Sequence, residues 1–144
     1  MTKYKKPDHV GWDLWQATAV WKQRFTRGMV EHGHNWYAEA RGSLMQFLSD
    51  EGIAQTTLTE LSGLTKQAVQ QHLDDLTNDG IIRRVPDASD KRRKLVVLTE
   101  KGLRALQDAT SVKLKIEQDY QHALGKDKLD GLKAALAAII KLGA

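Results

Sequence analysis

Three glutamines on one short segment are the residues of this chain whose types and spacing most clearly suggest a binding chemistry. The segment, residues 64–76, reads LTKQAVQQHLDDL. On a helix, at about 100° per residue, its apolar side chains gather on one side: Val69, Leu73 and Leu76. Its polar side chains gather on another side: Lys66, Gln67, Gln70, Gln71 and Asp74. The helix would therefore have an apolar side that packs in a core and a long polar side that faces a ligand or water.

The order of these polar residues favours double-stranded DNA as the ligand. Lys66 and the neutral amides come first and the acids come last, so a helix entering the major groove N-terminus first keeps its acids away from the phosphates. A glutamine can bind adenine through two hydrogen bonds, worth about 1–3 kcal/mol of discrimination. We therefore predict that Gln67, Gln70 and Gln71 face base edges. Thr65 and Lys66 are expected near the phosphates, together with the free N–H groups of the first turn. The alternative is that glutamine is a good exposed helix former and needs no ligand.

A basic hairpin is predicted after this helix. The β-rich segments IIRRV and KLVVLT predict two strands, and PDASDKRR between them predicts a turn-rich tip. A solvated loop is the alternative, but four consecutive basic residues between two strands favour contact with a polyanion. We predict that the tip contacts the DNA backbone or the adjacent minor groove. Its DNA-binding residues would be Lys91, Arg92, Arg93 and Lys94.

The acidic residues of this region limit the effect of its charge. Residues 53–98 contain seven basic and six acidic side chains, so binding must depend on where the charges lie. Asp87 and Asp90 would oppose phosphate binding unless they have a structural role. We expect Asp90 to orient Arg92 or to cap the hairpin turn.

The elements that must position these residues are predicted to form a winged helix-turn-helix. TTL at residues 56–58 predicts a short strand, Thr59 an N-cap, and Gly63 a turn. Thr65 is predicted as a second N-cap, opening a helix from Lys66 to about Asn78. A short helix, a tight turn, a second helix and a two-stranded ribbon make up this arrangement.

Longer helices are predicted on both sides of these elements. The apolar spacing gives helices from Asp13 to about Val30, from about Trp36 to Ser49, from Thr99 to about Leu124, and from about Lys128 to Leu142. The first is apolar on two sides, which indicates contact with both a core and a partner subunit. The fold class expected is mainly α with a small β-ribbon.

The ribbon also carries a recognisable motif. Asp90 and Arg92 form D-x-R, which is followed by five residues and then by Leu98 and Thr99, and LTEKG ends at Gly102. Over residues 57–102 the sequence resembles the DNA-binding lobe of the MarR family of bacterial transcription regulators. The resemblance implies that Arg92 lies at the wing tip. It also implies a homodimer whose two recognition helices lie about one DNA turn apart on a pseudo-palindromic operator, with repression as the commoner mode.

The resemblance implies an organisation and a function for the whole chain. We expect a single MarR-like domain, residues 1–144. Residues 53–99 would form the winged helix-turn-helix lobe, and residues 1–52 and 100–144 would form the dimerisation helices. The expected function is a dimeric repressor that a small aromatic or anionic effector releases from DNA. The alternative is a winged helix that binds another protein and has no sequence-specific affinity for DNA.

An effector pocket is a further implication of the resemblance. MarR-like dimers often respond to small anionic aromatic or lipophilic molecules bound between the lobe and the dimer helices. All four tryptophans lie within the first 36 residues, and aromatic walls with an arginine would suit a carboxylate. The predicted pocket residues are Trp15, Trp36, Tyr37 and Arg41. The alternative is that the tryptophans fill the core and the dimer interface.

Composition limits the other classes of function. The chain has no cysteine, which excludes disulfides, thiolate catalysis and cysteine-based zinc sites. His32 and His34 lack the neighbouring ligands of a metal site, and no serine lies in a nucleophile elbow. We expect no enzyme activity, no cofactor and no metal. No apolar run approaches the ~20 residues of a membrane span, and the N-terminus does not read as a secretory signal, so we expect a soluble cytoplasmic protein.

Overall fold

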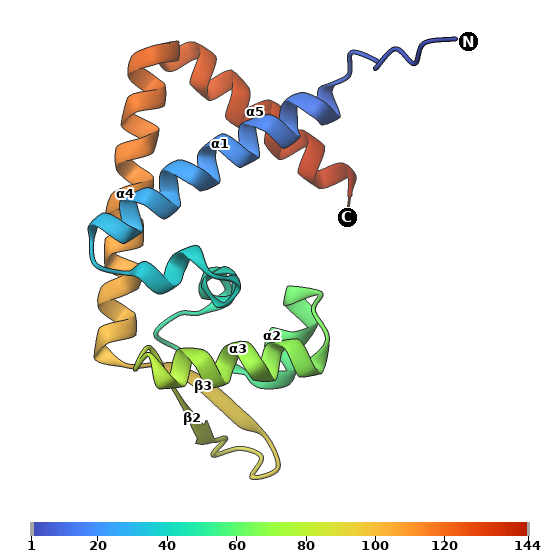
Figure 1. The fold of residues 1–144 in the computed structure, drawn as a ribbon. Helices are drawn as coiled ribbons and strands as arrows, with labels where there is room; N and C mark the ends of the chain where they lie inside the picture. The colour runs from blue at the N-terminus through green and yellow to red at the C-terminus, as the bar shows by residue number, and fades with distance from the viewer. Residues whose placement is uncertain (1, 144) are drawn as a thin grey trace.

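The computed structural model describes residues 2–143. It has long helices at one end and a smaller lobe at the other, with α4 (Glu100–Leu124) extending from one to the other (Figure 1). Helix α1 (Val10–Glu31) packs against α4, and α4 continues through Gly125 into α5 (Lys126–Leu142). The predicted fold class, mainly helical with a small amount of β-structure, is confirmed. Residues 1 and 144, the ends of the ranges predicted to dimerise, lie outside the described residues.

The lobe contains the winged helix. Its elements in chain order are β1 (Ile53–Ala54), α2 (Gln55–Ser62), α3 (Lys66–Asn78), β2 (Ile82–Pro86) and β3 (Lys94–Leu98). The strands form an antiparallel sheet in the order β1-β3-β2, so that Val96 of β3 lies between Ile53 and Arg84. The predictions of the helix from Lys66 to Asn78 and of both ribbon strands are confirmed.

Two predicted elements are wrong. Residues 56–58, predicted as a strand, belong to α2, and Thr59 lies inside that helix, where its hydroxyl donates to the Gln55 carbonyl at 3.0 Å. The reason is burial, because Leu58 is fully enclosed by the lobe core and packing overrides the strand preference of threonine.

The helix predicted from Trp36 to Ser49 is also divided. Two 3₁₀ helices, η1 (Asn35–Ala38) and η2 (Ala40–Phe47), replace it. Between them Glu39 is extended, and the backbone at Gly42 approaches the Tyr37 carbonyl so closely that a Cβ there would lie 2.5 Å from its oxygen. An uninterrupted α-helix could not make this turn.

Two apolar clusters hold the chain together. The larger lies in the lobe, where Leu44 and Met45 of η2 pack with Leu58, Leu73 and other buried side chains. The smaller joins α1 to α4 through residues that include Met29, Ala109, Val112 and Ile116. Because Ala105 of α4 belongs to the lobe cluster, α4 links the two.

Apolar side chains also lie exposed on the two terminal helices. On α1 they are Val10, Trp12, Trp15, Val20 and Val30, and on α5 they are Leu132, Ile139, Ile140 and Leu142. None of the helices within residues 2–143 is both long enough and apolar enough to cross a membrane.

Candidate nucleic-acid interface

The glutamine helix α3 begins at a defined turn and cap. Gly63 turns the chain with a φ of 67°, in the left-handed region that side chains disfavour. Thr65 is extended, and its Oγ1 accepts a hydrogen bond from the Ala68 N–H at 3.0 Å. The prediction that Thr65 is an N-cap is confirmed. Because this bond uses the Ala68 N–H, the N–H groups of Lys66 and Gln67 remain in the first turn for an anion.

Helix α3 has the two-sided character expected from its sequence. Val69, Leu73 and Leu76 are fully buried in the lobe core. The predicted DNA-contacting side chains of this helix and its cap are all exposed: Thr65, Lys66, Gln67, Gln70 and Gln71. The core thus fixes the rotation of the helix about its axis and presents the amides to solvent.

Two of the three amides are held by neighbouring side chains. Gln71 donates from Nε2 to Asp75 Oδ1 at 3.2 Å, one helical turn later. Gln70 donates from Nε2 to Asp74 Oδ1 at 3.1 Å and accepts, at Oε1, a hydrogen bond of 2.7 Å from Nε2 of Gln55. The partner residue Gln55 belongs to α2, so the bond joins the two helices.

An ion pair joins α3 to the wing. Arg84 of β2 donates from Nη2 to Asp74 Oδ1 at 2.5 Å. This hydrogen bond lowers the pKa of Asp74 below its ordinary value of 3.8. The Arg84 side chain is therefore paired within the lobe, whereas the side chain of the neighbouring Arg83 is exposed to solvent.

Backbone bonds shape the wing tip. The Asp87 N–H donates to the Arg93 carbonyl at 3.0 Å, and the Arg93 N–H donates to the Asp90 carbonyl at 3.0 Å. Asp90 Oδ1 accepts from the Arg92 N–H at 3.1 Å and faces its Nε at 3.5 Å, which confirms the expected role of Asp90. The Arg92 side chain is 92% exposed.

The second acid of the tip is structural as well. Asp87 Oδ1 accepts from the Ser89 N–H at 2.9 Å and from the Ser89 hydroxyl at 2.7 Å. These bonds lower the pKa of Asp87. Both acids that would oppose phosphate binding are thus engaged in forming the turn.

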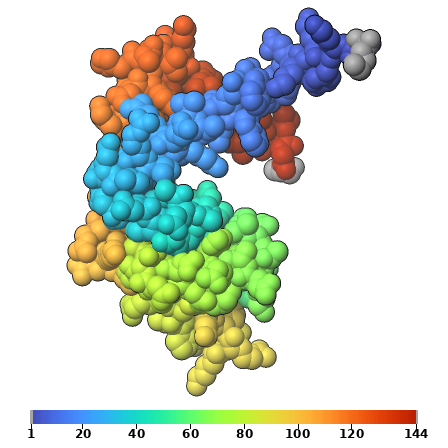
Figure 2. All heavy atoms as spheres, in the orientation of Figure 1, coloured from blue at the N-terminus to red at the C-terminus, as the bar shows by residue number. Residues whose placement is uncertain are grey.

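The predicted DNA-binding residues form two exposed groups, one on α3 with its cap and one at the wing tip. The tip group is Lys91, Arg92, Arg93 and Lys94. The wing projects from the lobe below α3, at the end of the molecule away from α1 and α5 (Figure 1), and its tip protrudes in the space-filling view (Figure 2). The sequence reasoning missed Gln55, because the residues after it were read as a strand.

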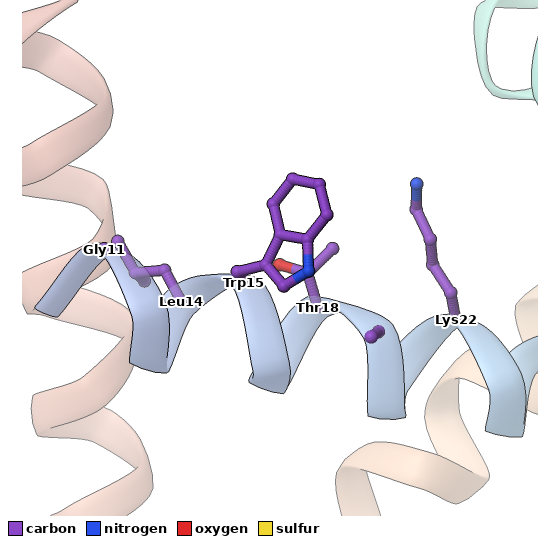
Figure 3. A pocket seen from close by; sticks show the side chains of 6 residues that line it. Gly11, Leu14, Trp15, Thr18 and Lys22 are labelled. Carbon is purple, nitrogen blue, oxygen red and sulfur yellow. The ribbon is translucent and has the colours of Figure 1, made fainter. Parts of the chain in front are cut away.

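The four predicted effector residues are not gathered in one place. Trp36 and Tyr37 lie together, with ring centroids 4.7 Å apart, and burial raises the pKa of Tyr37 to about 12. Trp36 is buried, and its Nε1 has no hydrogen-bond partner among the described residues. Trp15, by contrast, is 71% exposed on α1. It borders a surface groove whose lining residues all belong to that helix (Figure 3).

Arg41, the fourth of these residues, is bound by carboxylates of the chain itself. It donates from Nε to Asp79 Oδ2 at 2.6 Å and from Nη1 to Glu39. The hydrogen bond to Asp79 is the largest cause of a raised pKa of Arg41. The pair ties η2 to the C-terminal end of α3, where Asp79 is the cap residue.

The two histidines are placed separately. His34 is buried and its Nε2 lies 2.7 Å from Asp108 Oδ2 on α4, whereas the ring of exposed His32 lies against the Gly28 carbonyl. Within residues 2–143 no group of three or more potential ligand residues is placed to hold a metal ion.

Comparison with known proteins finds similar regulators in bacteria. Residues 42–93 match the sequence profile of the MarR family. The chain is 31% identical over 87 residues to the transcriptional regulator HosA of Escherichia coli, covering 60% of this chain and 64% of HosA. It is 31% identical over 108 residues to the regulator PetP of Rhodobacter capsulatus, and the match covers 72% of this chain and 63% of PetP. The chain thus spans less than two thirds of the length of these relatives. A Staphylococcus aureus MepR–DNA complex has the same fold, with a TM-score of 0.70 at 22% identity, covering 94% of this chain and 98% of that chain.

Proposed function

Since this chain belongs to the MarR family, we propose that it is a sequence-specific transcription regulator that binds double-stranded DNA through residues 53–99. The observation that carries the proposal is that α3 exposes a row of amides and the wing tip exposes four basic side chains. Helix α3 and the wing both lie at the end of the molecule away from α1 and α5 (Figure 1). Neutral amides suit base edges in the major groove, and cations suit the phosphates and the narrow minor groove that flank it. HosA and PetP are named as transcriptional regulators, and MepR has been solved with DNA.

The residues have different roles in this proposal. Gln67, Gln70 and Gln71 contact base edges and set the sequence preference. Lys66 and the cap at Thr65 lie near phosphates, and the wing residues 91–94 contact the backbone or the minor groove. None of these roles involves catalysis, which agrees with relatives that are regulators and not enzymes.

We propose that the acting unit is a homodimer in the cytoplasm. The exposed apolar side chains of α1 and α5 support this, because an apolar surface of this kind is stabilised when a second copy covers it. Residues 1–52 and 100–144 would form the dimer, and the two α3 helices would read the halves of a pseudo-palindromic operator as a repressor.

A small effector that releases the protein from DNA would compete with contacts made within the chain. A carboxylate effector would have to displace Asp79 or Glu39 from Arg41. The buried Trp36 Nε1, without an acceptor among residues 2–143, favours the neighbourhood of Trp36 and Tyr37 as the place where an effector with an acceptor atom would bind.

Selection of bound duplexes from a random DNA pool, at two salt concentrations, tests the proposed function. We expect enrichment of an inverted repeat, with an affinity that falls steeply as salt rises because bound cations release counterions. The control is the triple variant Gln67→Ala, Gln70→Ala, Gln71→Ala, which should keep the salt dependence and lose part of the sequence preference.

Two results would contradict the proposal. If the triple variant enriches the same sequence as the unaltered protein, α3 is not the reading helix. If the unaltered protein enriches no sequence at either salt concentration, the winged helix serves instead as a protein interaction module, whose partner binding would be insensitive to salt.

A further inference from the structure

A line of hydrogen bonds runs across three elements of the lobe and passes through one of the three amides of α3. It begins at Gln55, the first residue of α2, reaches Gln70 on α3, continues to Asp74 one turn later and ends at Arg84 on β2. The successive donor–acceptor distances are 2.7, 3.1 and 2.5 Å. The Gln70 carboxamide is therefore held from both sides.

The chemistry of the outer partners fixes which way the carboxamide faces. Arg84 keeps Asp74 in its ionised form, and an ionised carboxylate accepts hydrogen bonds and donates none. Gln70 must therefore turn its Nε2 toward Asp74, which leaves its Oε1 facing Gln55. Gln55 completes the line because its own amide supplies the donor that Oε1 needs.

We propose that Gln55 is a specificity-determining positioning residue, which acts through Gln70 on the recognition of one base pair. The inference rests on the proposed DNA binding. A carboxamide has two N–H groups and two acceptor lone pairs, so Gln70 keeps one donor and one acceptor after both internal bonds are made. Their order is fixed, and adenine presents an acceptor and a donor in a fixed order in the major groove. Asp74 sets which order Gln70 presents, and the bond from Gln55 holds the carboxamide in that order.

The second amide, Gln71, provides an internal comparison. Within residues 2–143 its side chain is anchored on one side, by Asp75, and no residue of α2 bonds to it there. Its carboxamide can rotate when DNA binds, so the base pair that it reads should not depend on Gln55.

The test measures base preference and not affinity alone. Gln70→Ala identifies its base pair as the position where discrimination falls, by at least about fivefold. Gln55→Ala should reduce discrimination at the same position by about two- to fivefold and leave the other positions unchanged. In the Gln70→Ala background, Gln55→Ala should have no further effect, because the double-mutant cycle isolates the coupling of the two residues.

A second substitution, Gln55→Glu, replaces the amide donor that faces Gln70 Oε1 with a carboxylate acceptor. In Gln55→Glu the carboxylate cannot donate to Gln70 Oε1, so the loss of discrimination should equal or exceed that of Gln55→Ala. Its added negative charge also weakens binding to every sequence. Thr56→Glu is the matched control, because it places the same charge on the next residue of α2 and should weaken binding without changing the preferred sequence.

Three results would overturn this inference and leave sequence-specific DNA binding in place, given an unaltered protein that enriches an operator. They are an unchanged base preference in Gln55→Ala and Gln55→Glu, an effect of Gln55→Ala that persists without Gln70, and a Gln70→Ala variant that loses discrimination nowhere. An unaltered protein that enriches no sequence would overturn the proposed function and this inference with it.

Discussion

Asp74 brings a negative charge onto the polar face of α3, and Arg84 neutralises it from β2. An acid on this face would repel phosphate if it were unpaired, so the ion pair would serve the proposed DNA interface as well as the lobe. The pairing holds the pKa of Asp74 below 3.8. Asp74 therefore stays ionised near neutral pH, and it remains an acceptor for Gln70.

Replacing Arg84 should release the Asp74 carboxyl. We expect Arg84→Ala to raise the pKa of Asp74 toward its ordinary value of 3.8, measured by carbon-detected NMR titration of the carboxyl groups. A depressed folded-state pKa gives stability that is present above pH 3.8 and is lost as the pH falls through the folded value. That contribution should be absent in the variant. Asp87 is the control, since Ser89 lowers its pKa. An Asp74 pKa that is equal in both proteins would contradict the pairing.

Residue types could be predicted from the sequence better than residue partners. The exposure of Gln67, Gln70 and Gln71 follows from their angular position on the helix, so the predicted exposed face is correct. Their bonding does not follow, because the contact of Gln70 with Gln55 crosses 15 residues and depends on how α2 and α3 pack. Nothing in the local sequence around Gln55 identifies it as part of the interface.

At the scale of elements, α4 joins the wing at a junction that has no room for a side chain. Thr99 caps α4 by accepting from the Gly102 N–H at 3.1 Å, and its own N–H donates to the Ile81 carbonyl at 3.0 Å. A Cβ at position 102 would overlap that carbonyl oxygen. The glycine is therefore required by close packing between the start of α4 and the start of the wing.

Substitution at this junction should weaken the lobe. We expect Gly102→Ala to lower the free energy of unfolding by about 1–3 kcal/mol, because the clash is with backbone and must be relieved by moving α4 or β2. Urea denaturation followed by circular dichroism measures the change. Gly131→Ala on α5 is the control, since no atom lies within 4 Å of its added Cβ and alanine favours the helix by about 1 kcal/mol. Equal stability of Gly102→Ala and the unaltered protein would show that the junction can relax.

Elements with a strong local signal could be predicted, and those set by packing could not. Helix α3 has a cap, a regular apolar stripe and a turn at each end, and its bounds are as expected. Residues 56–58 have two threonines and only one buried leucine, which is too short a pattern to separate strand from helix. The division between η1 and η2 arises from the contact of Gly42 with Tyr37, a tertiary feature.

At the scale of the whole molecule, the lobe and the terminal helices differ in what they expose. The lobe presents amides and cations, whereas α1 and α5 present large apolar side chains such as Trp15, 71% exposed, and Ile140, 75% exposed. Ion pairs fix α4 on its neighbours, with Arg24 of α1 on Asp119 and Lys133 of α5 on Glu117. These contacts hold the apolar helices on the same frame as the lobe, so a second copy bound there would set the spacing of two α3 helices.

A charge placed on the apolar surface should therefore separate the subunits and weaken DNA binding together. We expect the unaltered protein to sediment as a dimer, and Ile140→Glu or Trp15→Glu to raise the dimer dissociation constant by at least about tenfold, because an unpaired carboxylate would be buried at the contact. Affinity for an inverted repeat should fall as the dimer dissociates, since one lobe would hold only one half-site.

The control is Leu61→Glu at the end of α2, where a leucine 57% exposed lies in the lobe and not on α1 or α5. It should leave the mass at that of a dimer. Sedimentation equilibrium distinguishes these outcomes. An unaltered protein that is monomeric would contradict the homodimer, and a dimer that survives both substitutions would place the subunit contact elsewhere.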